Sequence, residues 1–512
     1  MGDGFFYGDA LRRELVKERI LNPKKFAFIV SFLCILTPLC FSAKGDDLEN
    51  AAVRITGEAF VKNNGLHTLR ILADEIGSRL TGSVAARQAA DYCLDLFKKY
   101  GLTNGHLESF ETAGWLPGQA LAEALEPFQK SLRIDTLGFS VNTPPQGLVA
   151  EVIDVGHGTE EDFEKAGPAI SGKIVLSGLK DPPNPARATK EWQKVDYAAA
   201  HGAAACLIIA GTRGGLTRTR ASGYGGYSPI PSVSIAYEDG TWLRRLLEEG
   251  KSLKMNLRTQ NKIFGKATAE NVVAEIRGKE KAEEVVILGA HLDSWFLGPG
   301  AADNALGVSI AVETARILNN PEFFVPKRTV RFILFSGEEE GLLGSFEYVK
   351  KHEAELDKVI LMVNLDMTGL MYPGILNPYG ACPIGDKLMD LLPLLEGMGI
   401  TQIESRYPYD SDDFNFVARG VPALGLQGRG TRDWSWGHSY ADTFEKIEVD
   451  KLNMNTAAIA TIIYYAANRA EPLSRRLSQA EVIKYFKDKN LDKILKQERT
   501  WNKLGFPDDE EK

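Results

Sequence analysis

The chain has 512 residues, which exceeds the usual size of a single hydrophobic core and indicates two or more domains. Hydrophobic residues make up 44% and charged residues 25% of the sequence, as in soluble globular proteins. The formal net charge of −8, with no long basic run in the body of the chain, argues against nucleic acid as a partner.

An apolar segment, residues 26–43, follows a basic leader at the start of the sequence. A membrane anchor needs about 17 to 25 apolar residues, so this segment is at the short limit. The leader is long for a signal peptide, although Pro38, Ser42 and Ala43 suit cleavage. Residues 1–47 are therefore a cytosolic leader with a signal peptide or a signal anchor, and we favour cleavage. Both alternatives send the body into the secretory pathway, because the positive side stays cytosolic.

The body of the chain divides into four regions. Residues 48–135 are helical in pattern at first and mixed from about residue 104, and they form the first part of a main domain. Short β-like runs and Gly/Pro-rich loops in 136–266 indicate an inserted module. In 267–473, apolar runs alternate with helical segments, which predicts an α/β domain with a largely parallel sheet. Residues 474–512 are a charged tail of surface helices with a frayed end.

Three cysteines lie beyond the apolar segment: Cys93, Cys206 and Cys382. This odd, sparse set predicts no disulfide framework. A chain of this length can be stable on core packing alone, so the absence of disulfides does not argue against secretion.

Potential metal ligands follow three of the apolar runs in the α/β region. His291 ends VVILGAH, Glu338 and Glu339 end VRFILFSGEE, and Asp366 ends VILMVNLD. A charged residue at such a position often only terminates a strand, and a single histidine there is as often hydrogen-bonded as metal-bound. Three such strands together favour a site, because the carboxyl ends of parallel strands meet at one crevice.

The glycine-rich loop after His291 adds two aspartates. It lacks the lysine of a phosphate-binding loop, and Asp303 stands where a dinucleotide-binding turn needs a small residue. With Asp303 and His438 of WGHSYADTF, the set contains nitrogen and oxygen ligands of the kind that suit zinc. Asp293 lies two residues after His291, on the same side of a strand, and is expected to hold the histidine ring. The alternative for Asp293 is a turn-capping role.

The glutamate run GEEEG, 337–341, is in most proteins a solvated surface patch. Here it follows an apolar strand and precedes the small, apolar GLLGS, so at least one carboxylate is expected to face inward. One glutamate could bind a metal while its neighbour acts as a base.

These motifs resemble a known family. In chain order, GAHLDSW, GAADNA, SGEEEGLLGS, NLDM and HSYADT are similar to the zinc-dependent exopeptidases with two co-catalytic metal ions, which include bacterial aminopeptidases and glutamate carboxypeptidases. GSRLTGS, TPPQGLVAEV and DFNFVARGVPALGL resemble the plasma glutamate carboxypeptidase branch. The resemblance implies a three-layer α/β/α zinc-exopeptidase fold with a mixed, mostly parallel sheet, and it identifies 136–266 as an inserted β-rich protease-associated domain.

The resemblance also implies roles for residues around two zinc ions per subunit. The implied ligands are His291, Asp303, Glu339, Asp366 and His438, of which Asp303 bridges the two ions. Glu338 is implied to be the general base, and Asp293, which is expected to hold the His291 ring, is the second predicted catalytic residue. A shifted register would make Glu339 the base and Glu340 the ligand. Asn304 departs from the related branch, which has acidic residues there, but the wider family tolerates asparagine.

Exopeptidase action requires recognition of a charged terminus. Four candidates for substrate binding lie in two loops near the end of the α/β region: Asp413, Asn415, Arg429 and Arg432. Asp413 could hold a substrate amine, and the arginines could receive a carboxylate, although ordinary solvation is the alternative for both arginines. Trp434 and Trp436 could line a side-chain pocket or pack in the core.

The sequence therefore predicts a zinc-dependent exopeptidase that hydrolyses dipeptides or terminal residues of short peptides through a metal-bridging hydroxide. The alternatives are a catalytically inactive receptor-like binding protein on the same scaffold and a glutaminyl cyclase-like enzyme. The resemblance further implies a homodimer that is secreted or lysosomal. A single-pass membrane protein with a luminal or extracellular catalytic domain, anchored through 26–43, is the alternative location.

Overall fold

The computed structural model of the chain describes residues 44–178, 189–322, 324–407, 411–430 and 433–507. The apolar segment 26–43 and Arg432 lie outside these residues. Among the helices of the described chain, none combines the length and the apolar character needed to cross a bilayer.

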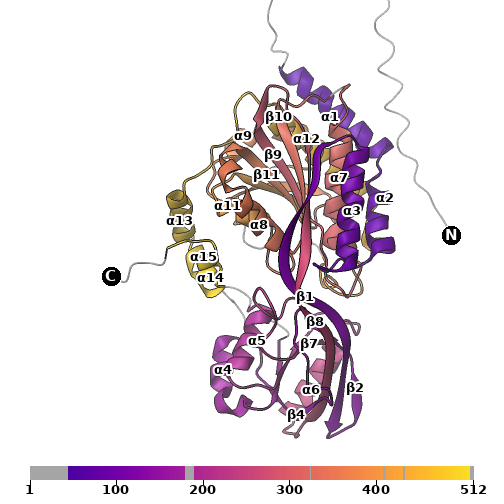
Figure 1. Ribbon diagram of the computed structural model, residues 1–512, viewed down its shortest axis with the longest axis vertical. Coiled ribbons are helices and arrows are strands. Elements are labelled where there is room, and N and C mark those ends of the chain that lie inside the picture. The colour runs from indigo at the N-terminus through magenta and orange to yellow at the C-terminus, as the bar shows by residue number, and fades with distance from the viewer. Residues whose placement is uncertain (1–43, 179–188, 323, 408–410, 431–432, 508–512) are drawn as a thin grey trace, which may run out of the picture. The chain divides into compact units, whose positions relative to one another are not determined.

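A mixed sheet forms the centre of the main body of the protein (Figure 1). Its strands, in spatial order, are β13 (Gln402–Ile403), β12 (Pro373–Tyr379), β14 (Ala423–Gly428), β11 (Val359–Leu365), β9 (Lys281–His291), β10 (Arg328–Phe335), β8 (Lys254–Ile276) and β1 (Thr103–Glu126). The four strands β14, β11, β9 and β10 are parallel to one another, whereas β8 and β1 join in antiparallel pairs. The carboxyl ends of the parallel strands therefore open at one edge.

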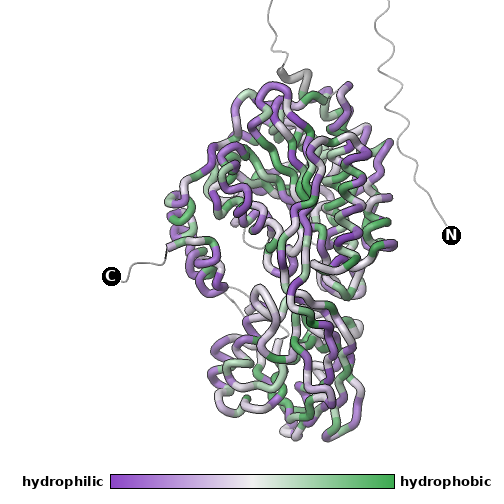
Figure 2. The backbone as a smooth tube through the Cα atoms, in the orientation of Figure 1, coloured by the Kyte–Doolittle hydropathy of each residue, from purple (hydrophilic) through white to green (hydrophobic). Residues whose placement is uncertain are grey.

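Alternate strand residues enter two cores, which makes the body three-layered. Val286 and Leu288 of β9 face one core, and Val285 and Ile287 face the other. The first core packs against α1 (Lys44–Val61), α2 (Gly65–Arg70), α3 (Val84–Lys99), α7 (Leu306–Leu318) and α12 (Val449–Asn468). The second packs against α8 (Leu343–Lys351) and α11 (Asp413–Val417). Figure 2 shows hydrophobic residues concentrated in the central strands. This is the three-layer α/β fold predicted from the sequence.

Strands β1 and β8 run on as a two-stranded ribbon into the inserted module. They pair from Thr103–Glu275 to Glu126–Lys254. β8 then pairs with β4 (Leu148–Asp154), and the module continues through β5 (Ile174–Ser177), β6 (Ala205–Ile209), β7 (Ser232–Ile235) and β3 (Ile134–Thr136), with β2 (Lys130–Leu132) beside β1. Three helices cover it: α4 (Glu160–Ala166), α5 (Glu191–Ala200) and α6 (Tyr237–Glu248). The module is therefore inserted into a continuous hairpin of the main sheet.

The C-terminal region forms α13 (Gln479–Asp488), α14 (Leu491–Gln497) and α15 (Thr500–Lys503). Their charge predicted helices on the surface. In the structure, their apolar side chains also extend the second core. Phe486 and Trp501 are almost fully buried in the same cluster as Phe414 of α11. The three cysteines of the described chain are buried and free.

Candidate metal centre

The ends of β9, β10 and β11 lie side by side and place predicted site residues at one edge. His291 is the last residue of β9 and pairs with Phe335, the last residue of β10. Asp366 directly follows Leu365, the last residue of β11, which pairs with Ala290 of β9. Parallel register thus brings a histidine and a carboxylate from neighbouring strands together.

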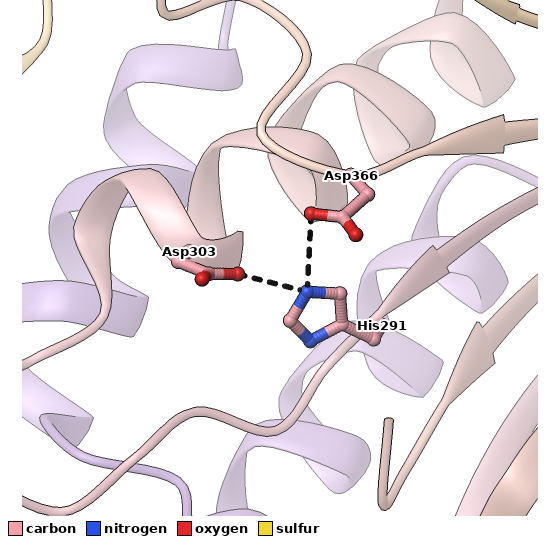
Figure 3. A group of neighbouring side chains, drawn as sticks. All are labelled: His291, Asp303 and Asp366. Carbon is pink, nitrogen blue, oxygen red and sulfur yellow. Dashed lines mark ion pairs between the residues drawn. The ribbon is translucent and has the colours of Figure 1, made fainter. Parts of the chain in front are cut away.

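A first group of three ligand-type side chains forms at this edge (Figure 3). Nε2 of His291 lies 3.0 Å from Oδ1 of Asp303 and 3.7 Å from Oδ1 of Asp366. Asp303 reaches the group from the turn Ala301–Ala305, in which Asp303 and Asn304 have non-helical backbone angles and which leads directly into α7. The three ligand atoms lie within 4.8 Å of one another, which is close enough to hold one ion.

A second group shares Asp303 with the first. Nε2 of His438 lies 2.9 Å from Oδ2 of Asp303 and 3.3 Å from Oε1 of Glu339. Asp303 therefore turns one carboxylate oxygen toward His291 and the other toward His438. The described residues contain these two groups of candidate ligands and no third.

The electrostatics of both groups are those of a site built for a cation. Burial lowers the pKa of His291, but three surrounding carboxylates outweigh it and raise that pKa well above its ordinary value. Against the same effect of burial, Glu339 and Asp303 raise the pKa of His438 to about 9. Without another cation, therefore, both histidines carry the positive charge that the carboxylates require.

Two buried polar atoms support the fit of a metal ion. Nε2 of His291 and Oε1 of Glu339 have no hydrogen-bond partner among the described residues. Leaving buried polar atoms unpaired is costly, so such atoms in a native site point to a missing ligand. Imidazole nitrogens with carboxylate oxygens are a donor set that zinc accepts.

Asp293 supports the glutamates as well as the histidine. Its Oδ1 accepts a hydrogen bond from the backbone N–H of Glu338 and its Oδ2 accepts one from Glu339, both at 3.2 Å. Nδ1 of His291 lies 3.2 Å from the carbonyl oxygen of Asp293 and 3.8 Å from its carboxylate. One buried aspartate thus fixes the ring and the glutamate turn together.

The three consecutive glutamates have different surroundings. Glu339 belongs to the second group, whereas Glu340 turns away and its Oε2 accepts a hydrogen bond from Thr81 at 2.6 Å. Burial raises the pKa of Glu338 well above its ordinary value. Glu338 lies outside both groups of candidate ligands, which leaves its carboxylate available to exchange protons.

Two residues beside Asp303 were not singled out as site residues by sequence reasoning. The carboxylate of Asp442 accepts the backbone N–H of Ala302 at 2.7 Å and that of Asp303 at 3.1 Å. The amide of Asn304 donates to the carbonyl of Leu365 at 2.7 Å. Together they hold the carboxylate of Asp303, which is common to both groups, between the strand ends. Asp442 is part of the HSYADT segment, so this motif held a signal for it.

Arg79 holds the glycine-rich loop and was also missed. It is fully buried, and its guanidinium donates to the carbonyls of Leu292, Pro299 and Gly300 at 2.7–2.9 Å. The same loop packs closely on the segment that carries His438, because a Cβ at Gly298 would lie 2.3 Å from the carbonyl oxygen of Ser439. The loop therefore packs against the segment that carries His438 and leads into the turn that carries Asp303, and it is not a nucleotide-binding turn.

The predicted substrate-binding residues are placed differently from one another. Asp413 is buried and accepts from Asn364 at 3.1 Å, and Asn415 donates to Ser345 at 2.8 Å, so both are used inside the protein. Arg429 is exposed directly after β14, and its backbone N–H donates to the carbonyl of Tyr372. Neither group of candidate ligands includes any of them.

Trp434 packs beside the second group. Its ring centre lies 6.1 Å from that of His438 and 4.9 Å from that of Trp436. On another side of the histidine, the ring of Trp295 lies 6.4 Å away. The tryptophans of this segment thus form part of the wall around His438.

A loop of the inserted module reaches this segment. The backbone N–H of Thr219 donates to the carbonyl of His438 at 3.0 Å, and Nε of Arg218 donates to that of Gly437 at 2.7 Å. Desolvation lowers the pKa of Arg220, but nearby carboxylates, first that of Glu191 and then those of Glu339 and Asp303, raise it above its ordinary value. The side chain of Arg220 is still 47% exposed. The module therefore brings an accessible cation to the candidate ligands.

Comparisons with known proteins match both parts of the chain. The model of peptidase family M28 matches residues 271–463, and the PA domain model matches residues 141–243. The first range contains all five candidate ligands. The second confirms that the inserted module is a protease-associated (PA) domain.

The chain is similar to relatives over most of its length. It is 30% identical to carboxypeptidase Q of Bos taurus, covering 84% of this chain and 90% of the relative. It is 26% identical to aminopeptidase YwaD of Bacillus subtilis strain 168, covering 80% and 86%. A solved structure of a peptidase M28 precursor from Shewanella amazonensis SB2B matches with a TM-score of 0.75 and 27% identity, covering 84% of this chain and 99% of that one.

The chain combines the two parts that the family models match separately. A three-layer body holds ligand-type side chains at its strand ends, and a PA domain is inserted into one hairpin of its sheet. The protein therefore belongs to peptidase family M28.

Proposed function

We propose that the protein is a metallo-exopeptidase with two zinc ions that hydrolyses dipeptides or terminal residues of short peptides. The observation that carries the proposal is the position of Asp303, whose two carboxylate oxygens face two separate groups of ligands. Membership of the M28 family supports a metal-dependent peptidase. Zinc as the ion, and two ions as their number, are our inference from the donor set.

Five side chains are placed to hold the ions. His291 and Asp366 would complete one site, Glu339 and His438 the other, and Asp303 would be common to both. When bound, two zinc ions supply a nucleophilic hydroxide at neutral pH and polarise the carbonyl of the scissile bond. The metal-free histidines are cationic, so loading with zinc releases protons.

Glu338 is proposed to move the proton. It lies next to the proposed ligand Glu339 and is held through its backbone by Asp293. Burial raises its pKa, which makes its carboxylate a stronger base for taking a proton from the attacking water and giving it to the departing amine. A positioned general base of this kind contributes about 10²- to 10⁴-fold in rate.

Arg220 is proposed to bind the carboxylate at the substrate's C-terminus. A guanidinium matches a carboxylate through two parallel hydrogen bonds. Among the described arginines near the site, Arg220 keeps an exposed side chain, whereas Arg218 is committed to the carbonyl of Gly437. This arrangement favours dipeptides and carboxypeptidase action, the activity named in the carboxypeptidase Q relative. Arg429, which follows β14, is not needed for this role.

The substitution Glu338→Gln tests the mechanism. It keeps the side chain's size and removes its basicity, so dipeptide hydrolysis should fall about 10²- to 10⁴-fold while the zinc content stays at two ions per chain. Glu340→Gln is the matched control, because Glu340 is bonded to Thr81 outside both groups and should retain activity. Substantial turnover by the Glu338 variant would reassign the base to another glutamate.

Metal analysis separates this proposal from its two alternatives. A catalytically inactive binding protein would carry no zinc, and a glutaminyl cyclase-like enzyme would carry one ion and release a cyclised product. The destination in the secretory pathway is also proposed, and it rests on the apolar segment 26–43 alone. Sequencing the N-terminus of the protein recovered from expressing cells would decide whether that segment is removed.

A further inference from the structure

The C-terminal helices connect the peptidase body to the PA domain. Phe486 and Trp501 are buried in the second core of the body, as described above. Between them, Nη2 of Arg499 forms an ion pair with Oδ2 of Asp196 on α5 at 2.9 Å. Nζ of Lys190, next to the start of α5, lies 3.5 Å from Glu498. The C-terminal helices therefore contact both the peptidase body and the PA domain.

Arg499 also packs on two aromatic rings of the PA domain. Its guanidinium lies 5.4 Å from the ring centre of Trp192 and 5.8 Å from that of Tyr224. The two rings are 5.0 Å apart. Cation–π contacts of this kind are attractive and favour arginine over lysine. Arg499 thus joins helix α5 to the loop that carries Tyr224.

Arg499 contacts two elements, helix α5 and the loop that carries Tyr224. Arg220 belongs to this loop and contacts α5. Glu191, the neighbour of Trp192 on α5, places its Oε1 3.7 Å from Nε of Arg220. On the other side, Arg220 precedes Tyr224 in the same loop and follows Thr219, which is bonded to the carbonyl of His438. The position of Arg220 beside Glu191 therefore depends on α5 and the loop staying together.

We propose that Arg499 is a positioning residue for Arg220, so that the C-terminal helices help to determine selectivity for substrates with a free C-terminal carboxylate. This inference rests on the proposed function. Arg499 acts through Trp192, Tyr224 and Glu191 and does not touch the substrate. Its loss should weaken binding of the carboxylate while the metal ligands keep their places.

The kinetic test compares a dipeptide with the same dipeptide carrying a C-terminal amide. With Arg499→Ala, KM for the free dipeptide should rise about threefold, as expected for an exposed cation–π and ion-pair contact, with kcat and the amide rates unchanged. In an Arg220→Ala background, Arg499→Ala should have no further effect, because both changes act on one interaction. Arg475→Ala is the matched control, since that arginine pairs with Glu481 inside the C-terminal region.

A second measurement does not depend on turnover. Amide hydrogen exchange in α5 and in residues 217–224 should be faster in Arg499→Ala than in the wild type at equal zinc content. Charge reversal in Arg499→Glu should show the same effect, and adding Asp196→Arg should reverse it. Unchanged exchange, or an equal loss of rate on both substrates, would overturn the inference. A wild-type protein that hydrolyses neither substrate would instead contradict the proposed function, and the positioning role would fall with it.

Discussion

Asp442 orients the backbone that carries Asp303, the aspartate common to both groups of candidate ligands. Asp442 binds two consecutive backbone amides with its two carboxylate oxygens, so it sets where the carboxylate of Asp303 can lie. Burial raises the pKa of Asp442 to about 7, which is the cost of holding this acceptor away from water. Outer residues of this type fix the geometry of metal ligands in many proteins.

Replacing Asp442 with asparagine should loosen the site without removing a ligand. The amide keeps one acceptor oxygen but turns an NH₂ group toward a backbone N–H, so zinc affinity should fall about 10- to 100-fold. Competition with a chelator of known affinity measures the change. Asp95→Asn is the control, because the side chain of Asp95 on α3 is 80% exposed. Equal affinities in the two variants would contradict a positioning role for Asp442.

The pH dependence of the metal-free protein follows from His438. Its pKa is about 9 in the folded chain against an ordinary value of 6.5. The folded state thus binds this proton more tightly than the unfolded state, so the stabilisation is complete below pH 6.5 and lost as the pH rises through 9. The melting temperature of chelator-treated protein should fall over this range. Zinc-loaded protein should fall less, because the metal replaces the proton. A flat metal-free profile would argue against this linkage.

The glycine-rich loop is an element shaped by one arginine. Residues 292–300 form no helix or strand, and the loop closes around the buried guanidinium of Arg79. A guanidinium whose N–H groups donate to backbone carbonyls needs no carboxylate as a direct hydrogen-bond partner, which is why an arginine can be buried here. The loop's shape is thus a property of residues more than 200 positions away in the sequence.

Removing this arginine should destabilise the protein and the site together. Arg79→Met would leave buried carbonyls of Leu292, Pro299 and Gly300 without a donor, at a cost of at least about 3 kcal/mol. Denaturant unfolding of the zinc-loaded protein measures the loss of unfolding free energy. Arg87→Met, at a half-exposed arginine of α3, should change it by less than about 1 kcal/mol. Similar losses of unfolding free energy in the two variants would show that the hydrogen bonds of Arg79 contribute little to stability.

The elements differ in how far the sequence could predict them. Continuous apolar runs predicted the parallel strands, and polar residues at their ends predicted which side chains converge. The long strand β1 was missed, because bulges around Gly114 and between Leu116 and Gln119 break its alternation. Arg79, Asp442 and Arg220 were missed as site residues because they act across tertiary contacts that leave no local period.

At the scale of the whole molecule, the site combines two domains with separate tasks. The peptidase body supplies the five candidate ligands and Glu338. The PA domain supplies Arg220 and binds the backbone of the segment that carries His438. Under the proposed function, chemistry is placed in one domain and recognition of the substrate's end in the other.

This division can be tested on Arg220. Arg220→Ala should raise KM for free dipeptides about tenfold or more, since a charge-assisted hydrogen bond is worth about 1.5 to 3 kcal/mol, and it should leave zinc content unchanged. Arg213→Ala is the control, because that exposed arginine belongs to the same domain and packs on Tyr237. If both variants hydrolyse free dipeptides like the wild type, the carboxylate is bound elsewhere.

The ribbon of β1 and β8 has a consequence for how such proteins diversify. Gly114 and Gly265 face each other across it, and the hydroxyl of Tyr227 donates to both of their carbonyls. The same two strands therefore lead the chain into the PA domain and out of it. A cassette bounded in this way can be exchanged between lineages, or shortened to a tight hairpin turn, without shifting the register of the peptidase sheet. Preference for new peptides can then evolve while the hydrolytic apparatus is inherited intact.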